Sequence, residues 1–307
     1  MHFLVVGPGA MGCLFASRLI MAGNQVELLD YRPKRAMALQ HAGIKIEEGS
    51  EHSQVRVPII TEDPQTAPDA LLVCVKAGST RAALEKLVGK LPRRTPVITL
   101  QNGLGNKEIL LEMLKEQHIL GGITAEGATL LGPGHVRHAG KGNTIIGPLH
   151  PFPETVKKIV SVFQGAGFNA EAAEDIDAVI WGKLIINVGI NALTAITRLR
   201  NGTLPEVSAT LRVMKDAVAE AVSVAHARGI HLPYQDPLKK VIEVCNATAG
   251  NRSSMLQDIL VGRPTEVQFI NGAIARQGEE TGIATPVNNT LTSLVEALQE
   301  TVNEYIS

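Results

Sequence analysis

Residues 2–22, HFLVVGPGAMGCLFASRLIMA, decide the fold of the first half of the chain. A short β-forming run, His2 to Val6, leads into a glycine-rich turn, and a helical pattern follows from Cys13 to Ala22. Strand, glycine turn and helix in this order are typical of dinucleotide-binding domains, where backbone N–H groups and the positive helix end bind a pyrophosphate. The candidate cofactor-binding residues of the turn are Gly7, Pro8, Gly9, Ala10, Met11 and Gly12. The alternative is a purely structural glycine turn.

Two further apolar runs predict strands of the same sheet. Residues 70–75 and 96–100 are continuously apolar and bounded by turn residues, as strands buried on both faces of a parallel sheet are. Lys76 follows the first run and Asn102 follows the second, at the carboxyl edge where open α/β sheets bind ligands. With the helical segments between the strands, this pattern predicts a Rossmann-type α/β domain.

The segment after the predicted strand at residues 25–29 carries the residues that choose the cofactor. Asp30 stands near the position where an acid binds the ribose hydroxyls of NAD. Arg32, Lys34 and Arg35 could instead bind the additional phosphate of NADP, although a solvated turn also explains Lys34 and Arg35. The two signals conflict at this point of the chain.

The first domain is expected to end near residue 174. Residues 121–147 are rich in glycine and β-branched residues and predict antiparallel strands that extend the sheet. His135 and His138 in this segment are interpreted as surface residues rather than ligands. A helix over 154–164 and a strand over 168–172 complete a dinucleotide-binding domain of residues 1–174, and residues 175–307 are expected to form an all-α domain.

Composition excludes several classes of protein. The chain has 307 residues, of which 45% are hydrophobic and 19% charged, which suits a globular protein with two cores. A net charge of -1 argues against a nucleic-acid binder. There is no run of eighteen or more apolar residues and no signal-peptide pattern, so we expect a cytoplasmic protein without a membrane partner. The three cysteines lack CxxC spacing, so neither a disulfide framework nor a metal site is expected.

The second domain opens with a long apolar segment, residues 176–200, that carries one narrow polar stripe. Lys183, Asn187 and Asn191 are spaced i, i+4 and i+8, which places them on one face of a helix. An unpaired polar group out of water costs about 2–7 kcal/mol, so the stripe needs partners or a wet cleft. Neighbouring backbone can satisfy any single one of these groups, but three in register favour a functional site.

Further helices are expected in the rest of the second domain. The pattern predicts them over residues 203–229, 237–244, 267–280 and 286–305. Glu266 immediately precedes the third, where a negative charge interacts favourably with the helix dipole. Its role is therefore either to stabilise that helix or to serve a site.

Seven segments of the sequence resemble one family. They are GPGAMG at 7–12, LQNG at 100–103, WGKLIINVGINALTAI at 181–196, RNG at 200–202, SSMLQD at 253–258, GRPTEVQFINGAI at 262–274 and GIATPVN at 282–288. In this order they resemble ketopantoate reductase, also called 2-dehydropantoate 2-reductase, over nearly the whole chain. The lysine–asparagine helix and the two blocks at 253–266 are much more specific than the glycine turn.

The resemblance implies an enzyme that uses NADPH to reduce 2-dehydropantoate to (R)-pantoate, in pantothenate and coenzyme A biosynthesis. It implies Lys183 as the general acid, since an ammonium can stabilise and protonate the alkoxide formed by hydride addition. The substrate-binding residues that it implies are Asn187, Asn191, Ser254, which would bind the carboxylate, Glu266, which would bind the terminal hydroxyl, and Asn102. Asn102 and Glu266 are also expected at the cofactor, Lys76 is expected to line its cleft, and Arg32 is expected at its phosphate.

The sequence departs from the family at the end of the second strand, where the family commonly has an arginine and this chain has Asp30 and Tyr31. NADPH is still favoured because Arg32 is one position away, but NADH is an alternative. Another small 2-keto or 3-hydroxy acid could be the substrate. A non-catalytic nucleotide sensor is disfavoured because Lys183 is retained. The sequence leaves the oligomeric state open; an exposed apolar face on the helical domain would favour a homodimer.

Overall fold

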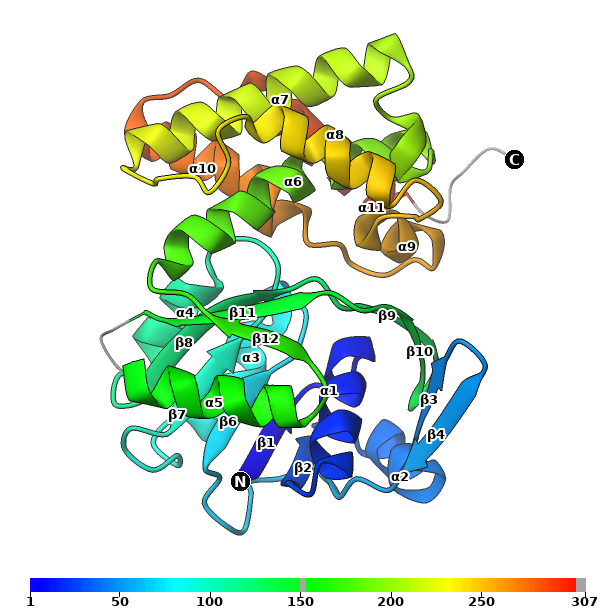
Figure 1. The fold of residues 1–307 in the computed structure, drawn as a ribbon, viewed down its shortest axis with the longest axis vertical. Coiled ribbons are helices and arrows are strands. Elements are labelled where there is room, and N and C mark those ends of the chain that lie inside the picture. The colour runs from blue at the N-terminus through cyan, green and yellow to red at the C-terminus, as the bar shows by residue number, and fades with distance from the viewer. Residues whose placement is uncertain (150–152, 302–307) are drawn as a thin grey trace. The chain divides into compact units, whose positions relative to one another are not determined.

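The computed structural model describes residues 1–149 and 153–301, which divide into two compact units (Figure 1). Unit 1 comprises residues 1–101 and 106–176, and unit 2 comprises residues 102–105 and the chain from residue 177 onward. Unit 1 contains an eight-stranded sheet in the order β12-β11-β8-β7-β6-β1-β2-β5. Its strands are β1 His2–Val6, β2 Gln25–Leu29, β5 Ile59–Ile60, β6 Ala70–Val73, β7 Pro96–Thr99, β8 His118–Thr124, β11 Asn143–Pro148 and β12 Asn169–Ala172.

Every neighbouring pair in this sheet is parallel except β8 with β11. Helices connect the parallel strands and cover both faces. They are α1 Ala10–Met21, α2 Pro33–Ala42, α3 Thr80–Leu84, α4 Asn106–Met113 and α5 Pro153–Gly165, with 3-10 turns at Ala77–Ser79 and Glu85–Leu87. The parallel sheet of unit 1 and the helices of unit 2 confirm the predicted fold class.

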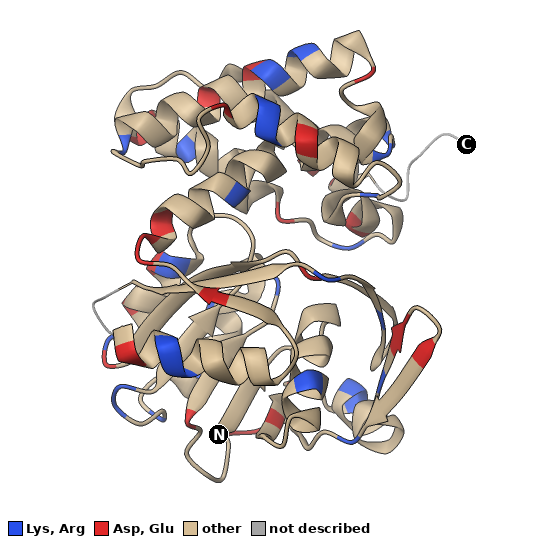
Figure 2. Ribbon diagram, viewed as in Figure 1, with Lys and Arg blue, Asp and Glu red and all other residues tan. Residues whose placement is uncertain are grey.

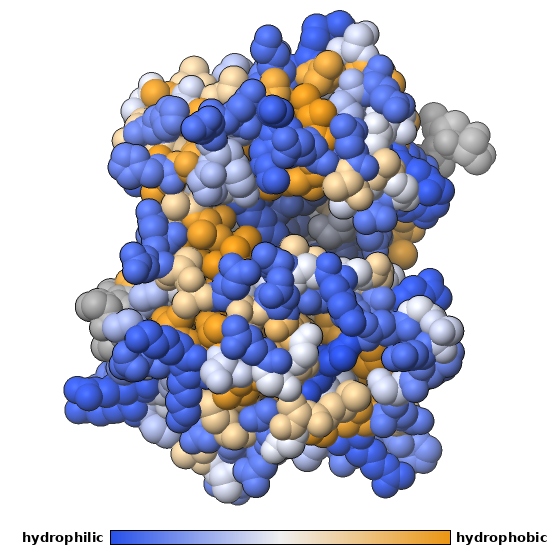
Figure 3. Space-filling model, in the orientation of Figure 1, coloured by the Kyte–Doolittle hydropathy of each residue, from blue (hydrophilic) through white to orange (hydrophobic). Residues whose placement is uncertain are grey.

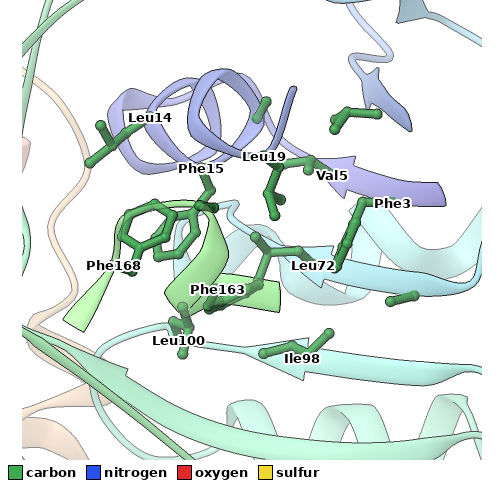
Figure 4. Packing of buried hydrophobic residues seen from close by; sticks show 14 of the residues in the cluster. Phe3, Val5, Leu14, Phe15, Leu19, Leu72, Ile98, Leu100, Phe163 and Phe168 are labelled. Atoms are coloured by element: carbon green, nitrogen blue, oxygen red, sulfur yellow. The ribbon is translucent and has the colours of Figure 1, made fainter. Parts of the chain in front are cut away.

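The alternation of side chains along the strands builds two cores in unit 1. In β1, Phe3 and Val5 point into one cluster while Leu4 and Val6 point into the other. The first cluster lies under α1 and α5 and is centred on aromatic rings, with Phe15 stacked on Phe168 at 4.3 Å between centroids (Figure 4). Because both faces of the central strands are buried, the continuous apolar runs of the sequence are explained.

A second, four-stranded sheet corrects the interpretation of residues 121–147. Its strands are β3 Ile44–Glu48, β4 Glu51–Val55, β9 Gly127–Gly132 and β10 His135–Gly140, in the order β4-β3-β10-β9. Only β8 and β11 of the predicted antiparallel strands lie in the main sheet. The expectation that His138 is a surface residue is wrong, because its ring is buried and bonded to Glu126 at 2.5 Å.

Unit 2 is helical, as predicted. Its helices are α6 Ile176–Thr197, α7 Ser208–Ala227, α8 Pro237–Ala247, α9 Ser254–Leu260, α10 Asn271–Thr281 and α11 Pro286–Glu300, with 3-10 turns at Asn201–Thr203 and Val267–Phe269. Side chains of α6, α7, α8, α10 and α11 form one apolar core. A Cβ at Gly189 of α6 would lie 2.7 Å from Val241 Cγ1 of α8, so the absence of a side chain allows these helices to pack closely.

A buried polar network joins several of these helices. Asn271 Nδ2 donates to Asn288 Oδ1 at 3.0 Å, and Asn288 Nδ2 donates to Glu220 Oε2 at 2.7 Å. Glu220 also accepts the backbone N–H groups of Val287 and Asn288 at the start of α11. These contacts satisfy helix-end donors that would otherwise be left without partners. They fix the positions of α7, α10 and α11 within unit 2.

Two of the helices predicted in unit 2 differ from the structure in where they begin or break. The helix predicted from residue 203 begins at Ser208, because residues 201–203 form a 3-10 turn and Thr210 donates back to the Leu204 carbonyl. The helix predicted over 267–280 is broken at Ile270, which has φ -112° and ψ -93°. The last helix is confirmed from residue 286 to residue 300, and the part expected at 302–305 lies outside the described residues.

The charges and apolar side chains of the surface are distributed over both units. Figure 2 shows positive and negative residues interspersed on each unit, in line with the net charge of -1. In Figure 3, hydrophobic side chains reach a largely hydrophilic surface on both units. The exposed large hydrophobic residues of unit 2 include Val207, Leu260, Val261 and Leu294. A homodimer stays a prediction. Within the described residues, α6 has the length and composition of a membrane span, but 67% of its most apolar window is buried, as in a core helix.

Candidate active site

The glycine turn of unit 1 combines two structurally required glycines with one that leaves space. Gly7 has φ +103°, and a Cβ on Gly12 would lie 2.0 Å from the Gly7 carbonyl oxygen. A Cβ on Gly9 would meet only the Cys74 carbonyl oxygen, at an ordinary 3.8 Å. Gly9 is therefore not needed for packing inside unit 1, and the space beside it is available to a ligand.

The first turn of α1 presents hydrogen-bond donors next to this space. Gly9 is the N-cap residue and has no side chain that could bond the N–H groups of Ala10, Met11 and Gly12. The first turn contains no acidic residue, so the positive end of the helix dipole is not neutralised locally. Together with the open space at Gly9, this arrangement fits a pyrophosphate, the group that a dinucleotide would place there.

The cofactor-selecting segment lies beside the turn. The Gly7 N–H donates to the Leu29 carbonyl at the end of β2, and Asp30 follows directly. Asp30 is buried and accepts the Arg32 backbone N–H at 3.0 Å. The Arg32 side chain is exposed, as is Lys76, which follows neighbouring β6. The order of β6, β1 and β2 in the sheet places these predicted residues along one carboxyl edge of unit 1.

In unit 2, α6 carries the polar stripe that the sequence predicts. Lys183 and Asn187 are partly buried, and Asn191 is buried. Neither carboxamide side chain has a hydrogen-bond partner among the residues that the structure describes. Two amides that lack partners on a largely apolar helix need bonds from a ligand or water.

The sequence interpretation missed Thr194, which continues the same stripe eleven residues after Lys183. Its hydroxyl donates to the Asn191 carbonyl at 2.9 Å and lies 2.6 Å from Ser253 Oγ. Ser253 is buried and caps α9 by accepting the Leu256 N–H, while Ser254, the predicted carboxylate ligand, is exposed at the first position of the helix. Helical spacing alone could have identified Thr194. Whether Ser253 or Ser254 faces solvent depends on which of them caps α9, which the sequence does not reveal.

Glu266 and Asn102 are brought together in unit 2, although they lie far apart in the sequence. Asn102 Nδ2 donates to Glu266 Oε2 at 3.3 Å. The Leu104 N–H donates to the Phe269 carbonyl, and a Cβ on Gly103 would lie 2.1 Å from that same oxygen. The loop of residues 102–105 therefore packs directly on the segment that carries Glu266, and Gly103 is required for this close approach.

Burial and charge act on Lys183 in opposite directions. Burial lowers the pKa of Lys183 from 10.5 to about 8, while the negative charge of Glu266 raises it. A buried ammonium with one carboxylate nearby can give up a proton near neutral pH much more readily than an ordinary lysine. Lys183, Glu266 and Asn102 thus form an acid–base cluster that is suited to proton transfer.

The predicted site residues consequently fall into two groups. Lys183, Glu266 and Asn102 form one cluster in unit 2, and Asn187 and Asn191 continue the stripe from it. The glycine turn, Arg32 and Lys76 belong to unit 1. Within residues 1–149 and 153–301, no group of three or more His, Cys, Asp or Glu side chains could hold a metal ion.

Comparison with known families gives matches in both halves of the chain. Residues 3–151 match the family described as ketopantoate reductase PanE/ApbA, and residues 175–299 match its C-terminal region. This chain belongs to the ketopantoate reductase family.

Known relatives and solved structures match over nearly the whole chain. A 2-dehydropantoate 2-reductase of Archaeoglobus fulgidus is 37% identical and aligns over 96% of this chain and 97% of its own length. A 2-dehydropantoate 2-reductase of Halobacterium salinarum is 34% identical and aligns over 97% of this chain and 99% of its own length. A PanE/ApbA family ketopantoate reductase from Ralstonia eutropha has a TM-score of 0.90 at 31% identity, covering 99% of this chain and 100% of that one. A D-mandelate dehydrogenase solved with NADH and anilino(oxo)acetate has a TM-score of 0.92 at 28% identity, with the same coverage.

The glycine turn gives a direct test of nucleotide binding. Gly9→Ala should leave the thermal unfolding midpoint near that of the wild type, because φ -75° suits alanine and the new Cβ makes only an ordinary contact. It should weaken the binding of NADPH or NADH about tenfold or more, equivalent to losing a charge-assisted hydrogen bond of about 1.5–3 kcal/mol. Nucleotide fluorescence titration measures the affinity.

Gly12→Ala is the matched control for that variant. Its Cβ would clash with the Gly7 carbonyl, so it should lower the free energy of unfolding by about 1–3 kcal/mol. If Gly9→Ala binds NADPH as tightly as the wild type does, the turn is a structural feature rather than a pyrophosphate site.

Proposed function

We propose that this chain catalyses the NADPH-dependent reduction of 2-dehydropantoate to (R)-pantoate, a step in pantothenate and coenzyme A biosynthesis. The observation that carries the proposal is the cluster of Lys183, Glu266 and Asn102 beside two carboxamides that lack side-chain partners within the described part of the chain. Relatives named 2-dehydropantoate 2-reductase, which align over nearly their full length, support the same substrate.

In the proposed reaction the residues of unit 2 act on the keto acid. When NADPH is bound, its nicotinamide supplies a hydride to the carbonyl carbon. The Lys183 ammonium faces the carbonyl oxygen, stabilises the negative charge that develops there and then transfers its proton to that oxygen. The product is a secondary alcohol, and Lys183 is left neutral until it takes a proton from solvent. A pKa of about 8 keeps most molecules protonated at neutral pH while making the proton easy to transfer.

The remaining residues of the cluster bind and orient the substrate. Asn187 and Asn191 can donate to the carbonyl and carboxylate oxygens, since each amide has two N–H donors and no side-chain partner among the described residues. Ser254, exposed at the start of α9, binds the carboxylate end. Glu266 accepts the terminal hydroxyl, and its bond from Asn102 holds the carboxylate in place for that contact.

Unit 1 binds the nucleotide in this proposal. The N–H groups of residues 10–12 and the space at Gly9 receive the pyrophosphate. Arg32 provides a positive charge for the 2′-phosphate that distinguishes NADPH from NADH, and Lys76 lines the cofactor cleft. Asn102 and Glu266 would also bind the nicotinamide end of the cofactor.

One solved structure favours a second candidate. The D-mandelate dehydrogenase that matches with a TM-score of 0.92 was solved with NADH. Reduction of another 2-keto acid, with NADH as the hydride donor, is therefore the alternative for this chain.

A substrate panel distinguishes the two. Oxidation of NADPH and of NADH is followed by the absorbance of the reduced nicotinamide, with 2-dehydropantoate, pyruvate, 2-oxoisovalerate and phenylglyoxylate as substrates. We expect the highest kcat/KM for 2-dehydropantoate with NADPH. Preference for phenylglyoxylate with NADH would establish the alternative, and the absence of turnover with every keto acid would contradict both.

The role of Lys183 predicts a large loss of rate without a loss of cofactor binding. Lys183→Ala should reduce kcat by about 10²–10⁴-fold, the usual contribution of a general acid, while NADPH affinity and folding stay near normal. In the wild type, kcat should fall as the pH rises above about 8, because the required ammonium is lost through its lowered pKa.

Lys215→Ala is the matched control, because Lys215 is an exposed lysine on α7 of the same unit. It should keep the wild-type kcat and pH profile. A well-folded Lys183→Ala protein with the wild-type turnover number would rule out Lys183 as the proton donor.

Glu266 predicts an effect that depends on the substrate. Glu266→Gln keeps the shape of the side chain but weakens its acceptor for a hydroxyl, so kcat/KM for 2-dehydropantoate should fall about ten- to hundredfold. 2-Oxoisovalerate lacks the terminal hydroxyl and should lose much less. The loss of rate at high pH should also move to lower pH, because the charge of Glu266 raises the pKa of Lys183.

The alternative role of Glu266, stabilising the helical segment that follows it, makes a different prediction. A lower thermal unfolding midpoint, with both substrates affected equally and an unchanged pH profile, would establish that structural role.

A further inference from the structure

Protein groups already bond both oxygens of the Asp30 carboxylate, which directly follows β2. Arg35 Nε donates to Asp30 Oδ2 at 2.5 Å, and Arg35 Nη2 donates to Asp30 Oδ1 at 2.7 Å. Oδ1 also accepts the Arg32 backbone N–H at 3.0 Å. The Asp30 side chain is only 2% exposed. Because this side chain is almost inaccessible and Arg35 bonds both of its oxygens, Asp30 is poorly placed to accept a ribose hydroxyl of NAD.

The bidentate pair leaves part of Arg35 available. Its guanidinium has five N–H donors, of which Asp30 takes one on Nε and one on Nη2. The Arg35 side chain is 34% exposed, whereas its partner is buried, so Arg35 is the member of the pair that a ligand can reach. Two fixed bonds hold the fork in one orientation, and a planar guanidinium held in this way is suited to binding an oxyanion.

The pair also lies where the adenosine ribose of a dinucleotide is expected. The glycine turn is bonded to the end of β2 through Gly7 N–H and the Leu29 carbonyl at 3.1 Å, and Asp30 is the next residue. In dinucleotide-binding domains the residue at this position faces the ribose. Arg32 and Lys34 expose two more cations on the same turn, so the net charge around Asp30 is positive despite its carboxylate.

We propose that Asp30 is a positioning residue that fixes the Arg35 guanidinium for the 2′-phosphate of NADPH, and that Arg35 thereby acts together with Arg32 in determining the cofactor preference. The inference rests on the proposed use of NADPH but not on the identity of the keto acid. Loss of Arg35 should affect NADPH and NADH differently. Without Arg35, a buried carboxylate is left next to the phosphate position, where it repels the phosphate and is free to accept ribose hydroxyls.

The test measures dissociation constants of NADP⁺ and NAD⁺ for the full chain by isothermal titration, without any keto acid. Arg35→Ala should weaken NADP⁺ binding about ten- to hundredfold and leave NAD⁺ binding unchanged or tighter. Asp30→Asn should weaken NADP⁺ binding by a smaller factor and leave NAD⁺ binding unchanged. In the double variant the two losses should not add, because both remove the same arrangement.

Arg35→Lys tests the positioning directly, and it does not depend on how well a variant of the buried Asp30 folds. A lysine keeps the charge but cannot form the bidentate pair, so NADP⁺ affinity should fall nearly as far as in Arg35→Ala. Arg81→Ala removes an exposed cation that pairs with Glu112 elsewhere in unit 1, and it should change neither affinity.

Two outcomes would overturn the proposal. If Asp30→Asn weakens NAD⁺ and tightens NADP⁺, Asp30 is a ribose acceptor. If Arg35→Lys retains the wild-type NADP⁺ affinity, only charge matters and Asp30 does not position Arg35. The titrations contain no keto acid, so their result does not depend on whether the chain reduces 2-dehydropantoate. Failure of this proposal and failure of the proposed function can therefore be distinguished.

Discussion

The position of one ammonium group inside an apolar helical domain is the constraint on which the candidate site depends. Lys183 lies on the most apolar helix of the chain, and burial lowers its pKa to about 8. Nearby Glu266 offsets part of that effect, and the bond from Asn102 holds Glu266 in place. The close packing of residues 102–105 on the segment ending at Phe269 is therefore part of the electrostatics of Lys183 and not only a packing detail.

Features that follow from a short, repeating pattern could be predicted from the sequence. The continuous apolar runs at β6 and β7 indicated strands buried on both faces, and Leu71 and Leu72 indeed enter opposite cores. The stripe on α6 followed from helical spacing alone, because a helix places residues four apart on one face. Lys183 was recognisable as a candidate site residue for a second reason, because placing a cation on an otherwise apolar helix costs free energy.

Features that depend on contacts distant in the sequence could not be predicted. Strand β10 pairs in parallel with β3, about ninety residues earlier, and no local pattern distinguishes this pairing from an extension of the main sheet. The backbone at Ile270 interrupts a segment whose residues favour a helix, because Phe269 must accept a bond from Leu104. Asp30 was identified as a cofactor-selecting residue, but only its geometry shows that Arg35 already occupies the carboxylate.

The chemistry proposed for Lys183 opposes the stability of the domain that holds it. A folded-state pKa of about 8, against 10.5 for an ordinary lysine, means that the unfolded chain binds a proton more readily between these two values. Stability should therefore rise with pH across this window, and below it the charged form costs the folded state on the order of 3 kcal/mol. The proposed reaction needs the ammonium, so it operates in the pH range where this cost is present. A residue chosen only for stability would be uncharged here, so a lysine at this position is in line with the proposed proton transfer.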